Sequence, residues 1–560
     1  MGTITNASSK VLTHAAEVPV GGGRLRVPVA AVSTAGLLAL YLALGAKALN
    51  LDGLGYAGRV QSGDQLLLPG HLLYAPIMYV IYRFGALFAP AVDAARVMQA
   101  CDAVFAAAGV GVFISALRRL SVGAFTAVTT GLALAFSYTY WVHATDLTTY
   151  AFSTFCLICA FHLLCSARSS GKGANVWAVG GMVALATLIH QSNLVFLPAA
   201  IVGVGVSGTG SRKSLKLAAI SLALICLPYA ILGWVATGSR NPAVIARWAA
   251  GGAHGYGLGF TPVNLARGVY GFANAVVYLD DAGTAIKGSV ANVSGSGLSS
   301  RDMLRLASKA GFVAVLLGVT CVAYVRRRKL SDEHRWAVKV CAAWIVPYTG
   351  VALIFFTTDH DRWIMLLPAV ATLVAVAFPR SSLRGRIAGV GAVAILFALN
   401  LTSAIYPAHL GTNNRYYQEA IRLAPRLAAT DLVIFWGHDH IGTAGYLRQL
   451  KRVEAVHVVN LVLKRGKPDG LRELTAMADN AMVAHRRVLV IGLYGTRDRA
   501  ADYLSEAHAL GLTRADVLRA LAPFTAQPVH IGTEDAYCLL PDRSRSQLPL
   551  LGERVGVRAP

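Results

Sequence analysis

The chain has 560 residues, of which 55% are hydrophobic and only 14% are charged. Its mean hydropathy of +0.54 excludes a soluble globular protein, because a water-soluble domain could not bury so much apolar surface. Lysine and arginine total 51 against 28 acidic residues, and this net charge of +23 is compatible with nucleic acid, anionic lipid or membrane topology.

The apolar stretches are long enough to cross a bilayer, which takes about 20 helical residues. Backbone amides in lipid must be satisfied within their own segment, so these stretches predict helices. The first, residues 27–49, is interpreted as a retained anchor, although its small residues leave a cleaved signal peptide open. Further spans are predicted near residues 95–117, 122–140, 149–166, 175–190, 194–208, 215–236, 306–325, 336–356, 363–378 and 387–406.

The stretch 72–88 contains Arg83 and is followed at once by another apolar run, so we interpret it as a helix lying at the outer interface. Basic residues collect in cytoplasmic loops and set the orientation of a membrane protein. With the N-terminal segment 1–26 inside, every later basic cluster falls in an inner loop, whereas counting 72–88 as a span would place them all outside. The sequence therefore predicts about eleven crossings of the cell (inner) membrane, with a cytoplasmic N-terminus. The basic clusters lie at residues 118–119, 168–172, 212–216, 326–329 and 380–386.

Three outer segments are long: residues 50–94, 237–305 and the tail after Tyr406. The tail, residues 407–560, alternates β-branched runs with amphipathic stretches, which predicts a small α/β domain with a mainly parallel sheet on the outer face. The predicted fold class is thus an α-helical polytopic membrane protein, with a transmembrane domain over residues 27–406 and a C-terminal α/β domain. The β-branched runs lie at 431–436, 454–459 and 487–492, and a Gly/Ser-rich loop is predicted at 288–300.

The first outer segment places Asp52 just past the first span and His71 at the start of the interfacial helix. Ionisable groups close to hydrocarbon are costly unless they have a task or a partner. Asp52 is a candidate general base or metal ligand, with His71 facing the same pocket, and Tyr56 is a candidate for substrate binding. The alternative is that Asp52 and Asp64 only cap helices.

The second outer connection contains His143 and Asp146, which could bind a phosphate-coordinated metal or orient an acceptor. Asp146 could instead cap the following helix. His190, Gln191 and Asn193 form a polar group between two spans, either as an interhelical hydrogen-bond cluster or as a sugar or phosphate contact.

A late outer turn combines Arg362 with Asp359, His360 and Asp361. A guanidinium offers two parallel hydrogen bonds to phosphate oxygens, so Arg362 is a candidate phosphate ligand, or it forms a structural ion pair with the adjacent acids. In the tail, residues 438–440 (His-Asp-His) follow a predicted strand and could ligate a metal, although a surface loop is favoured.

Over residues 27–406 this pattern resembles the GT-C superfamily of polyprenyl-phosphate-sugar-dependent glycosyltransferases, nearest to the protein O-mannosyltransferase-like and aminoarabinose-transferase-like branches. The resemblance implies that Asp52 is the catalytic acid-base or metal-associated residue, that His71 belongs to the family's histidine-proline turn, and that Asp146 is the second-loop acid. It also implies that Arg362 touches the lipid phosphate. This sequence lacks an acid beside Asp52 and lacks the family's double proline, which leaves the metal and the subfamily open.

The resemblance implies a hexosyl- or pentosyltransferase that moves a sugar from a polyprenyl-phosphate donor to an acceptor at the outer leaflet, with Asp52 as the base. The predicted partners are that donor and the lipid bilayer, with no nucleic acid; the acceptor, a protein, lipid or glycan, and a divalent metal ion stay open. A polytopic transporter or flippase is the main alternative, although the acids cluster at the outer ends of helices and no repeat is evident. A noncatalytic assembly or sensor protein is a third.

Overall fold

A computed structural model of the chain describes residues 29–171, 173–206, 210–250, 260–279, 330–354, 358–378, 382–437, 440–494, 510–531 and 534–541, with a few positions between 309 and 318. Three regions named above lie outside the described residues. They are the N-terminal segment 1–26, the Gly/Ser-rich stretch 288–300 and most of the predicted span 306–325.

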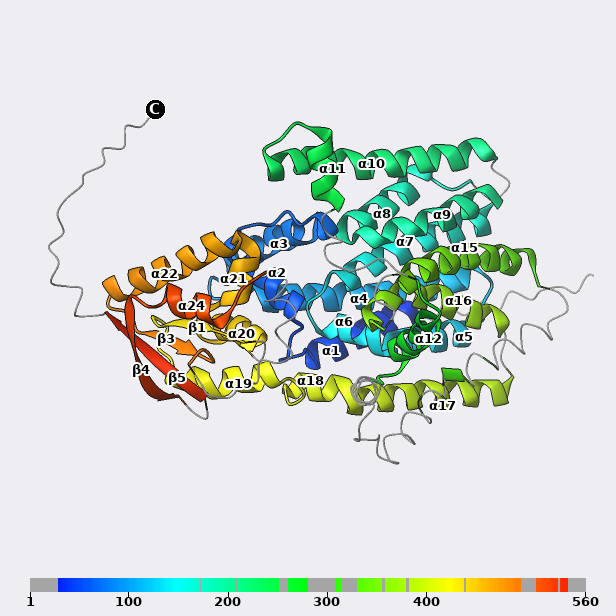
Figure 1. Ribbon diagram of the computed structural model, residues 1–560. Coiled ribbons are helices and arrows are strands. Elements are labelled where there is room, and N and C mark those ends of the chain that lie inside the picture. The colour runs from blue at the N-terminus through cyan, green and yellow to red at the C-terminus, as the bar shows by residue number, and fades with distance from the viewer. Residues whose placement is uncertain are drawn as a thin grey trace, which may run out of the picture.

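The described residues up to Asn400 form a bundle of helices, and the tail lies at one end of this bundle (Figure 1). Side-chain caps define several helix starts: Asp93 accepts from the backbone N–H of Ala95, and Asn175 accepts from that of Trp177. The helices at the predicted spans are α1 (Val29–Ala43), α4 (Ala94–Arg119), α5 (Ala124–Phe136), α7 (Thr149–Ser170), α8 (Val176–Ile189), α9 (Leu197–Val204), α10 (Ser211–Thr237), α15 (Asp332–Ile354), α16 (Leu367–Ala377) and α17 (Leu383–Asn400).

Shorter helices lie between these spans and carry most of the polar residues singled out above. Pro69 begins one of them at its first turn, where the missing N–H of proline costs no hydrogen bond. The short helices are α2 (Leu51–Ser62), η1 (Pro69–His71), α3 (Tyr74–Phe88), α6 (Tyr138–Thr145), η2 (Gln191–Phe196), α11 (Pro242–Ala250), α12 (Val263–Val276) and η5 (His360–Leu366).

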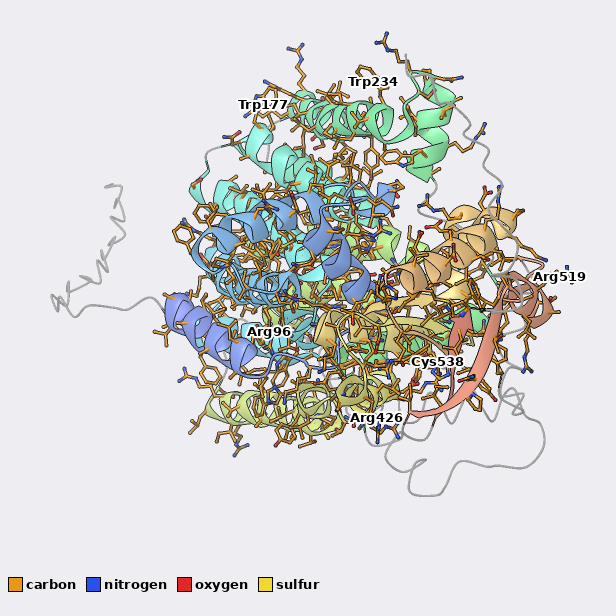
Figure 2. The ribbon with its side chains drawn as sticks, turned by 90° about the vertical axis from the view of Figure 1, so that its left-hand side faces the viewer. Arg96, Trp177, Trp234, Arg426, Arg519 and Cys538 are labelled. Atoms are coloured by element: carbon orange, nitrogen blue, oxygen red, sulfur yellow. The ribbon has the colours of Figure 1, made fainter. Side chains whose placement is uncertain are left out.

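Six helical segments of the described chain are long and apolar enough to cross a membrane. Large apolar side chains are exposed on them and on their shorter neighbours: Trp177 is 60% exposed, Trp234 44% and Leu383 74%. Figure 2 shows both tryptophans at the periphery, away from Arg519 and Cys538 of the tail. Such exposure fits lipid contact, because lipid removes the cost of an uncovered apolar surface. The total of eleven crossings stays a prediction.

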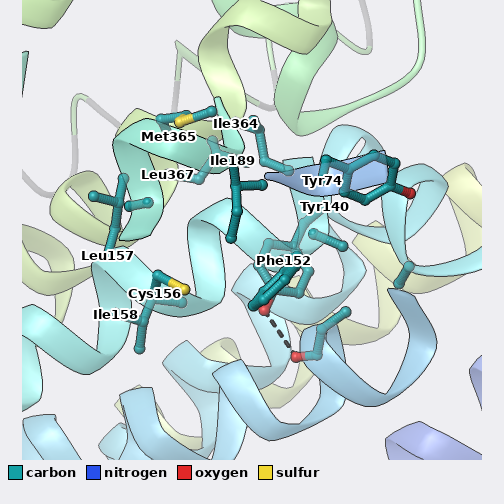
Figure 3. Close-up of a cluster of buried hydrophobic side chains, with 14 of the residues drawn as sticks. Tyr74, Tyr140, Phe152, Cys156, Leu157, Ile158, Ile189, Ile364, Met365 and Leu367 are labelled. Atoms are coloured by element: carbon teal, nitrogen blue, oxygen red, sulfur yellow. Dashed lines mark hydrogen bonds between the residues drawn. The ribbon is translucent and has the colours of Figure 1, made fainter. Parts of the chain in front are cut away.

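Helix α4 lies at the centre of the bundle and packs against α1, α5 and α7. Small residues let the backbones approach: a Cβ on Gly111 would stand 2.1 Å from Thr34 Oγ1, and one on Gly131 would stand 2.5 Å from Ile114. Figure 3 shows the apolar core beside it, where Tyr140 lies near Phe152, and the hydroxyl of Tyr140 donates to the carbonyl of Ala106 at 2.8 Å.

The predicted interfacial helix is α3. It buries Tyr74, Met78 and Tyr82 on one side and exposes Phe84 and Phe88 on the other. It is not among the segments long and apolar enough to cross a membrane in the described chain, which agrees with an interfacial position.

The tail contains a five-stranded sheet in the order β2-β1-β3-β5-β4. Strands β1, β2 and β3 pair in parallel, at the three β-branched runs identified in the sequence. The prediction of a mainly parallel sheet is wrong for the other half, because β4 pairs antiparallel with β5 and β5 pairs antiparallel with β3. The strands are β1 (Leu432–Phe435), β2 (Glu454–His457), β3 (Val488–Ile491), β4 (Phe524–Ile531) and β5 (Glu534–Pro541).

Helices cover the sheet and connect it to the bundle. Figure 1 shows α17, α18 and α19 following one another toward the sheet, with α20 beside α2. The remaining elements of the tail are η6 (Leu401–Ile405), α18 (Tyr406–Leu410), α19 (Arg415–Leu423), η7 (Ala424–Arg426), α20 (Ile441–Lys451), α21 (Val458–Arg465), α22 (Lys467–Val483) and α24 (Arg514–Ala520).

Candidate active site

Asp52 lies in the first turn of α2, in a segment that the sequence had suggested was a loop. The cap of this helix is Asn50, whose side-chain oxygen accepts from the backbone N–H of Asp52 at 2.7 Å and from that of Gly53 at 3.4 Å. Asp52 is therefore not the capping residue, and its carboxylate is left for another use. Tyr56 and Arg59 follow at i+4 and i+7, so α2 presents a carboxylate, a phenol and a guanidinium on one face.

The carboxyl of Asp52 lies at the exposed start of α2, yet the surrounding protein removes enough water to raise its pKa. The negative charge of Asp361 raises this pKa further, and the positive charge of Arg362 lowers it in part. Residues that are far apart in sequence therefore act on the same carboxyl. The tertiary structure brings the first outer segment and the late outer turn together.

Asp146 holds the start of α2 in place. The backbone N–H of Asn50 donates to its two oxygens at 3.2 and 3.0 Å, and the N–H of Leu147 donates at 2.7 Å. It does not cap α7, whose N-cap is Thr148. Burial raises the pKa of Asp146 to about 7, although these hydrogen bonds lower it. The neighbouring Asp102 accepts from the Thr148 N–H at 3.0 Å, so the whole turn is fixed by two buried carboxylates.

A series of rings runs from α2 to the late outer turn. Tyr56 contacts His71, His71 contacts His190, His190 contacts Tyr150, and Tyr150 contacts His143, with ring centroids between 4.7 and 5.7 Å apart. Aromatic and imidazole faces are suitable surfaces for a sugar ring and its hydroxyl groups. Four residues that the sequence analysis named as candidates, Tyr56, His71, His190 and His143, thus belong to one series of ring contacts.

His71 and His190 are held neutral by their surroundings. Loss of water lowers the pKa of His71 to about 4, and the charge of Arg362 contributes to this. Burial lowers the pKa of His190 well below its usual range, with further contributions from His71 and Arg362. The Nδ1 of His190 lies 2.7 Å from Ser192 Oγ, whereas its buried Nε2 has no hydrogen-bond partner. A buried nitrogen without a partner is costly, which points to a ligand atom at that position.

The late outer turn is the start of η5, where Asp359 caps the helix through the N–H of Asp361. Asp361 Oδ1 lies 2.9 Å from His143 Nε2 and 3.2 Å from His360 Nε2. Arg362 Nε lies 3.5 Å from Asp359 Oδ2, so the ion pair considered from the sequence is present. The guanidinium is one-third exposed, and its charge acts on Asp52, Tyr56, His71 and His190. The ion pair with Asp359 is therefore compatible with a phosphate contact by Arg362.

One group of side chains in the described part of the chain could hold a metal ion. Its members are Asp359, His360 and Asp361, whose ligand atoms all lie within 4.8 Å of one another. Carboxylate and imidazole ligands together suit a divalent ion such as zinc or manganese. The sequence left the metal open, with Asp52, the pair His143 and Asp146, and residues 438–440 as possible ligands; the group found here lies in η5 and its cap.

Two other candidates do not join the site. The side-chain amide of Gln191 donates to the carbonyl of Ala249 in α11 at 3.4 Å. His440 in the tail lies 2.6 Å from Glu419 Oε1 through Nδ1, and Thr443 donates to the other oxygen of Glu419 at 2.6 Å. Residues 438 and 439 lie outside the described residues.

Sequence reasoning missed Arg59, Asp361 as the centre of the outer turn, and Tyr150. The helical spacing of Asp52, Tyr56 and Arg59 was readable once a helix was assigned there. Asp361 was visible only as an acid beside Arg362, and its approach to His143 depends on the packing of η5 against α6. No local signal marked Tyr150.

No protein-family model and no curated protein matches this sequence. Among solved structures, ArnT from Cupriavidus metallidurans matches in its apo state with a TM-score of 0.55 and bound to undecaprenyl phosphate with a TM-score of 0.52. Both matches have 13% identity and cover 91% of this chain and 97% of ArnT. An oligosaccharyltransferase from Archaeoglobus fulgidus, in complex with Zn and sulfate, matches with a TM-score of 0.40 and 14% identity, over 90% of this chain and 72% of that one.

At such low identity the ArnT likeness shows the fold. It supports the predicted resemblance for the fold alone, and six helical segments of the described chain are long and apolar enough to cross a membrane.

Proposed function

We propose that this chain is a membrane glycosyltransferase of the GT-C type that moves a sugar from a polyprenyl phosphate to an acceptor at the outer leaflet, as its ArnT-like fold and its long apolar helices suggest. The ArnT structure with undecaprenyl phosphate supports a lipid phosphate as the donor's carrier. The observation that carries the proposal is the series of ring contacts that joins Tyr56 on α2 to His143, whose Nε2 lies 2.9 Å from Asp361 of η5, next to Arg362.

In the proposed reaction Asp52 accepts the proton of the acceptor hydroxyl as its oxygen attacks the anomeric carbon of the sugar. The bond between that carbon and the phosphate oxygen breaks, and the phosphate leaves with the electron pair. Arg362 donates to the phosphate oxygens and stabilises the charge that develops there. A single displacement of this kind inverts the configuration at the anomeric carbon.

The remaining candidates take supporting roles in the proposal. The neutral His71 and His190 and the phenol of Tyr56 contact the sugar, with His190 Nε2 hydrogen-bonded to one of its hydroxyls. His143 orients Asp361, and Asp146 positions Asp52 by holding Asn50. A divalent ion held by Asp359, His360 and Asp361 would supply Lewis-acid stabilisation of the leaving phosphate.

The proposal is tested by incubating the purified full chain in detergent with membrane extract and polyprenyl-phosphate mannose or arabinose, radiolabelled in the sugar. Asp52→Asn keeps the size of the side chain and removes the base, so transfer is expected to fall by about 10³-fold. Asp64→Asn, an exposed aspartate two residues beyond α2, is the matched control and is expected to retain wild-type activity. Undiminished transfer by Asp52→Asn contradicts the assignment of the base.

A transporter or flippase would give a different result in proteoliposomes. It would move the labelled lipid between leaflets without releasing polyprenyl phosphate, and Asp52→Asn would leave release unaffected because none occurs. The position of the acidic residues in α2, η5 and the turn after α6, at the ends of long helices, favours the transferase.

A further inference from the structure

The segment from Gly45 to Asn50, directly before Asp52, is held by hydrogen bonds from two sides. On the side of the bundle, the Ala46 N–H donates to the Thr145 carbonyl at 2.8 Å and Gln99 donates to the Ala46 carbonyl at 2.9 Å. These contacts tie the segment to α4 and α6. They leave the opposite side of the segment facing the tail.

The tail supplies the second set of contacts. The Ala408 carbonyl in α18 accepts from the N–H groups of Lys47 and Ala48 at 3.1 and 3.2 Å, and His409 Nδ1 lies 3.0 Å from the Gly45 carbonyl. The hydroxyl of Tyr446 in α20 donates to the Leu49 carbonyl at 2.5 Å. The segment is therefore clamped between the bundle and the tail.

The peptide unit between Leu49 and Asn50 is hydrogen-bonded at both of its polar ends. Its carbonyl accepts from Tyr446 of the tail, and its N–H donates to Asp146 of the bundle. Because a peptide is planar, two bonds at opposite ends fix the orientation of the whole plane. Asn50 caps α2 by accepting from the N–H of Asp52. The orientation of this peptide plane therefore sets the position of Asp52 at the start of the helix.

Tyr446 is itself rigidly placed. It is fully buried, its hydroxyl accepts from Asn414 Nδ2 at 3.1 Å, and its ring packs edge-on against Tyr417 at 5.3 Å. On the same helix Gly442 and Gly445 let α20 approach α2: a Cβ on Gly442 would stand 2.7 Å from Leu51, and one on Gly445 would stand 3.2 Å from Leu54. The tail thus meets α2 through a close, preformed contact.

From these contacts we infer that Tyr446 is a positioning residue for Asp52, and that the C-terminal domain is part of the scaffold of the active site. The catalytic part of this inference rests on the proposed function. It assigns the tail a task in the reaction that does not require it to contact the acceptor. The hydroxyl of Tyr446 donates to the Leu49 carbonyl and accepts from Asn414, and Tyr446→Phe removes both hydrogen bonds while keeping the buried ring.

The test compares Tyr446→Phe with Tyr417→Phe in the full chain. Each variant removes one hydroxyl from the same aromatic pair, and in the described structure only that of Tyr446 is bonded to the segment before Asp52. Hydrogen exchange is measured by mass spectrometry on peptides covering residues 45–54. Tyr446→Phe is expected to speed exchange at the start of α2 about five- to tenfold, with Tyr417→Phe at the wild-type rate.

Transfer kinetics then separate positioning from general structure. Tyr446→Phe is expected to lower kcat about tenfold with the KM for the donor unchanged, because a small misplacement of the base affects the chemical step. Its Tm is expected to fall, since the buried Leu49 carbonyl and Asn414 amide lose a partner, so rates are compared well below the Tm. Equal exchange rates in the two variants would show that the Tyr446 hydroxyl does not hold the segment before Asp52. Faster exchange with an unchanged kcat overturns the positioning role. Failure of the proposed function is distinguishable, since wild type would then show no transfer while the exchange difference persists, and the catalytic part of the inference would fall with it.

Discussion

In the described part of the chain, one cluster of histidine and carboxylate lies at η5 and another lies in the tail, and they differ in how fully their polar atoms are paired. In the tail, both oxygens of Glu419 are occupied, by His440 and by Thr443, each at 2.6 Å. At η5, Asp361 lies between His143 and His360, and nearby His190 keeps a buried nitrogen without a hydrogen-bond partner.

The difference predicts a structural cluster in the tail and a binding site at η5. A buried group whose hydrogen bonds are complete gains nothing from a ligand, whereas a buried group with an incomplete set is stabilised when a ligand supplies the missing partner. Residue types alone did not make this distinction, because both clusters contain a histidine and an acid and both lie near the end of a strand or helix. The following predictions test the contrast.

After Asp52→Asn, the largest effect is expected from Arg362→Gln. Loss of the guanidinium removes the charge that faces the leaving phosphate, so kcat/KM for transfer should fall about 10²- to 10³-fold. Binding of undecaprenyl phosphate alone, measured by the shift in Tm on adding it, should weaken as well. Arg83→Gln, an exposed arginine on α3, is the matched control, and an equal loss in both variants would show a nonspecific charge effect.

The pH dependence of transfer should show an acid limb from Asp52. As a base it acts only when ionised, so kcat/KM should fall about tenfold per unit below its pKa. Because lost solvation and Asp361 raise that pKa, the limb should lie above the usual aspartate value of about 3.9. His71, with a pKa of about 4, stays neutral above pH 5 and should not add a second limb near pH 6.5. Buffer titration of the initial rate measures both, and a limb centred at the usual aspartate value would contradict the environment assigned to Asp52.

A smaller effect is expected from His190→Phe. The phenyl ring preserves the edge-on contact with His71 and the tilted contact with Tyr150, and removes a buried nitrogen that lacks a partner. Transfer should fall about tenfold through a higher KM for the donor, while the Tm in detergent stays equal or rises. A marked fall in Tm would place His190 among the structural residues.

The tail cluster should respond in the opposite way. Glu419→Gln leaves one buried hydrogen bond to His440 or Thr443 unmade, which costs about 1–3 kcal/mol of folding stability and should lower the Tm by several degrees. Transfer at a temperature well below the Tm should change less than about threefold. A loss of activity as large as that of His190→Phe, at unchanged Tm, would remove the distinction between the clusters.

The sequence by itself determined that lipid surrounds the apolar segments of this protein and where its helices lie. Apolar runs of about 20 residues have no other stable form in lipid than a helix, so α4, α7, α10 and α15 follow from composition alone. The β-branched runs likewise predicted β1, β2 and β3. The polar residues of the predicted outer segments could be named as candidates, because an ionisable group near hydrocarbon is costly unless it has a function or a partner.

Only the tertiary structure decided which of those candidates meet. The contact of His143 with Asp361 joins residues more than two hundred positions apart, and that of Tyr446 with Leu49 joins nearly four hundred. It also decided what each group does: Asn50, not Asp52, caps α2, and Asp146 holds Asn50 instead of capping α7. Such choices depend on the hydrogen-bond partners that packing delivers, and local sequence carries no record of partners contributed by distant elements.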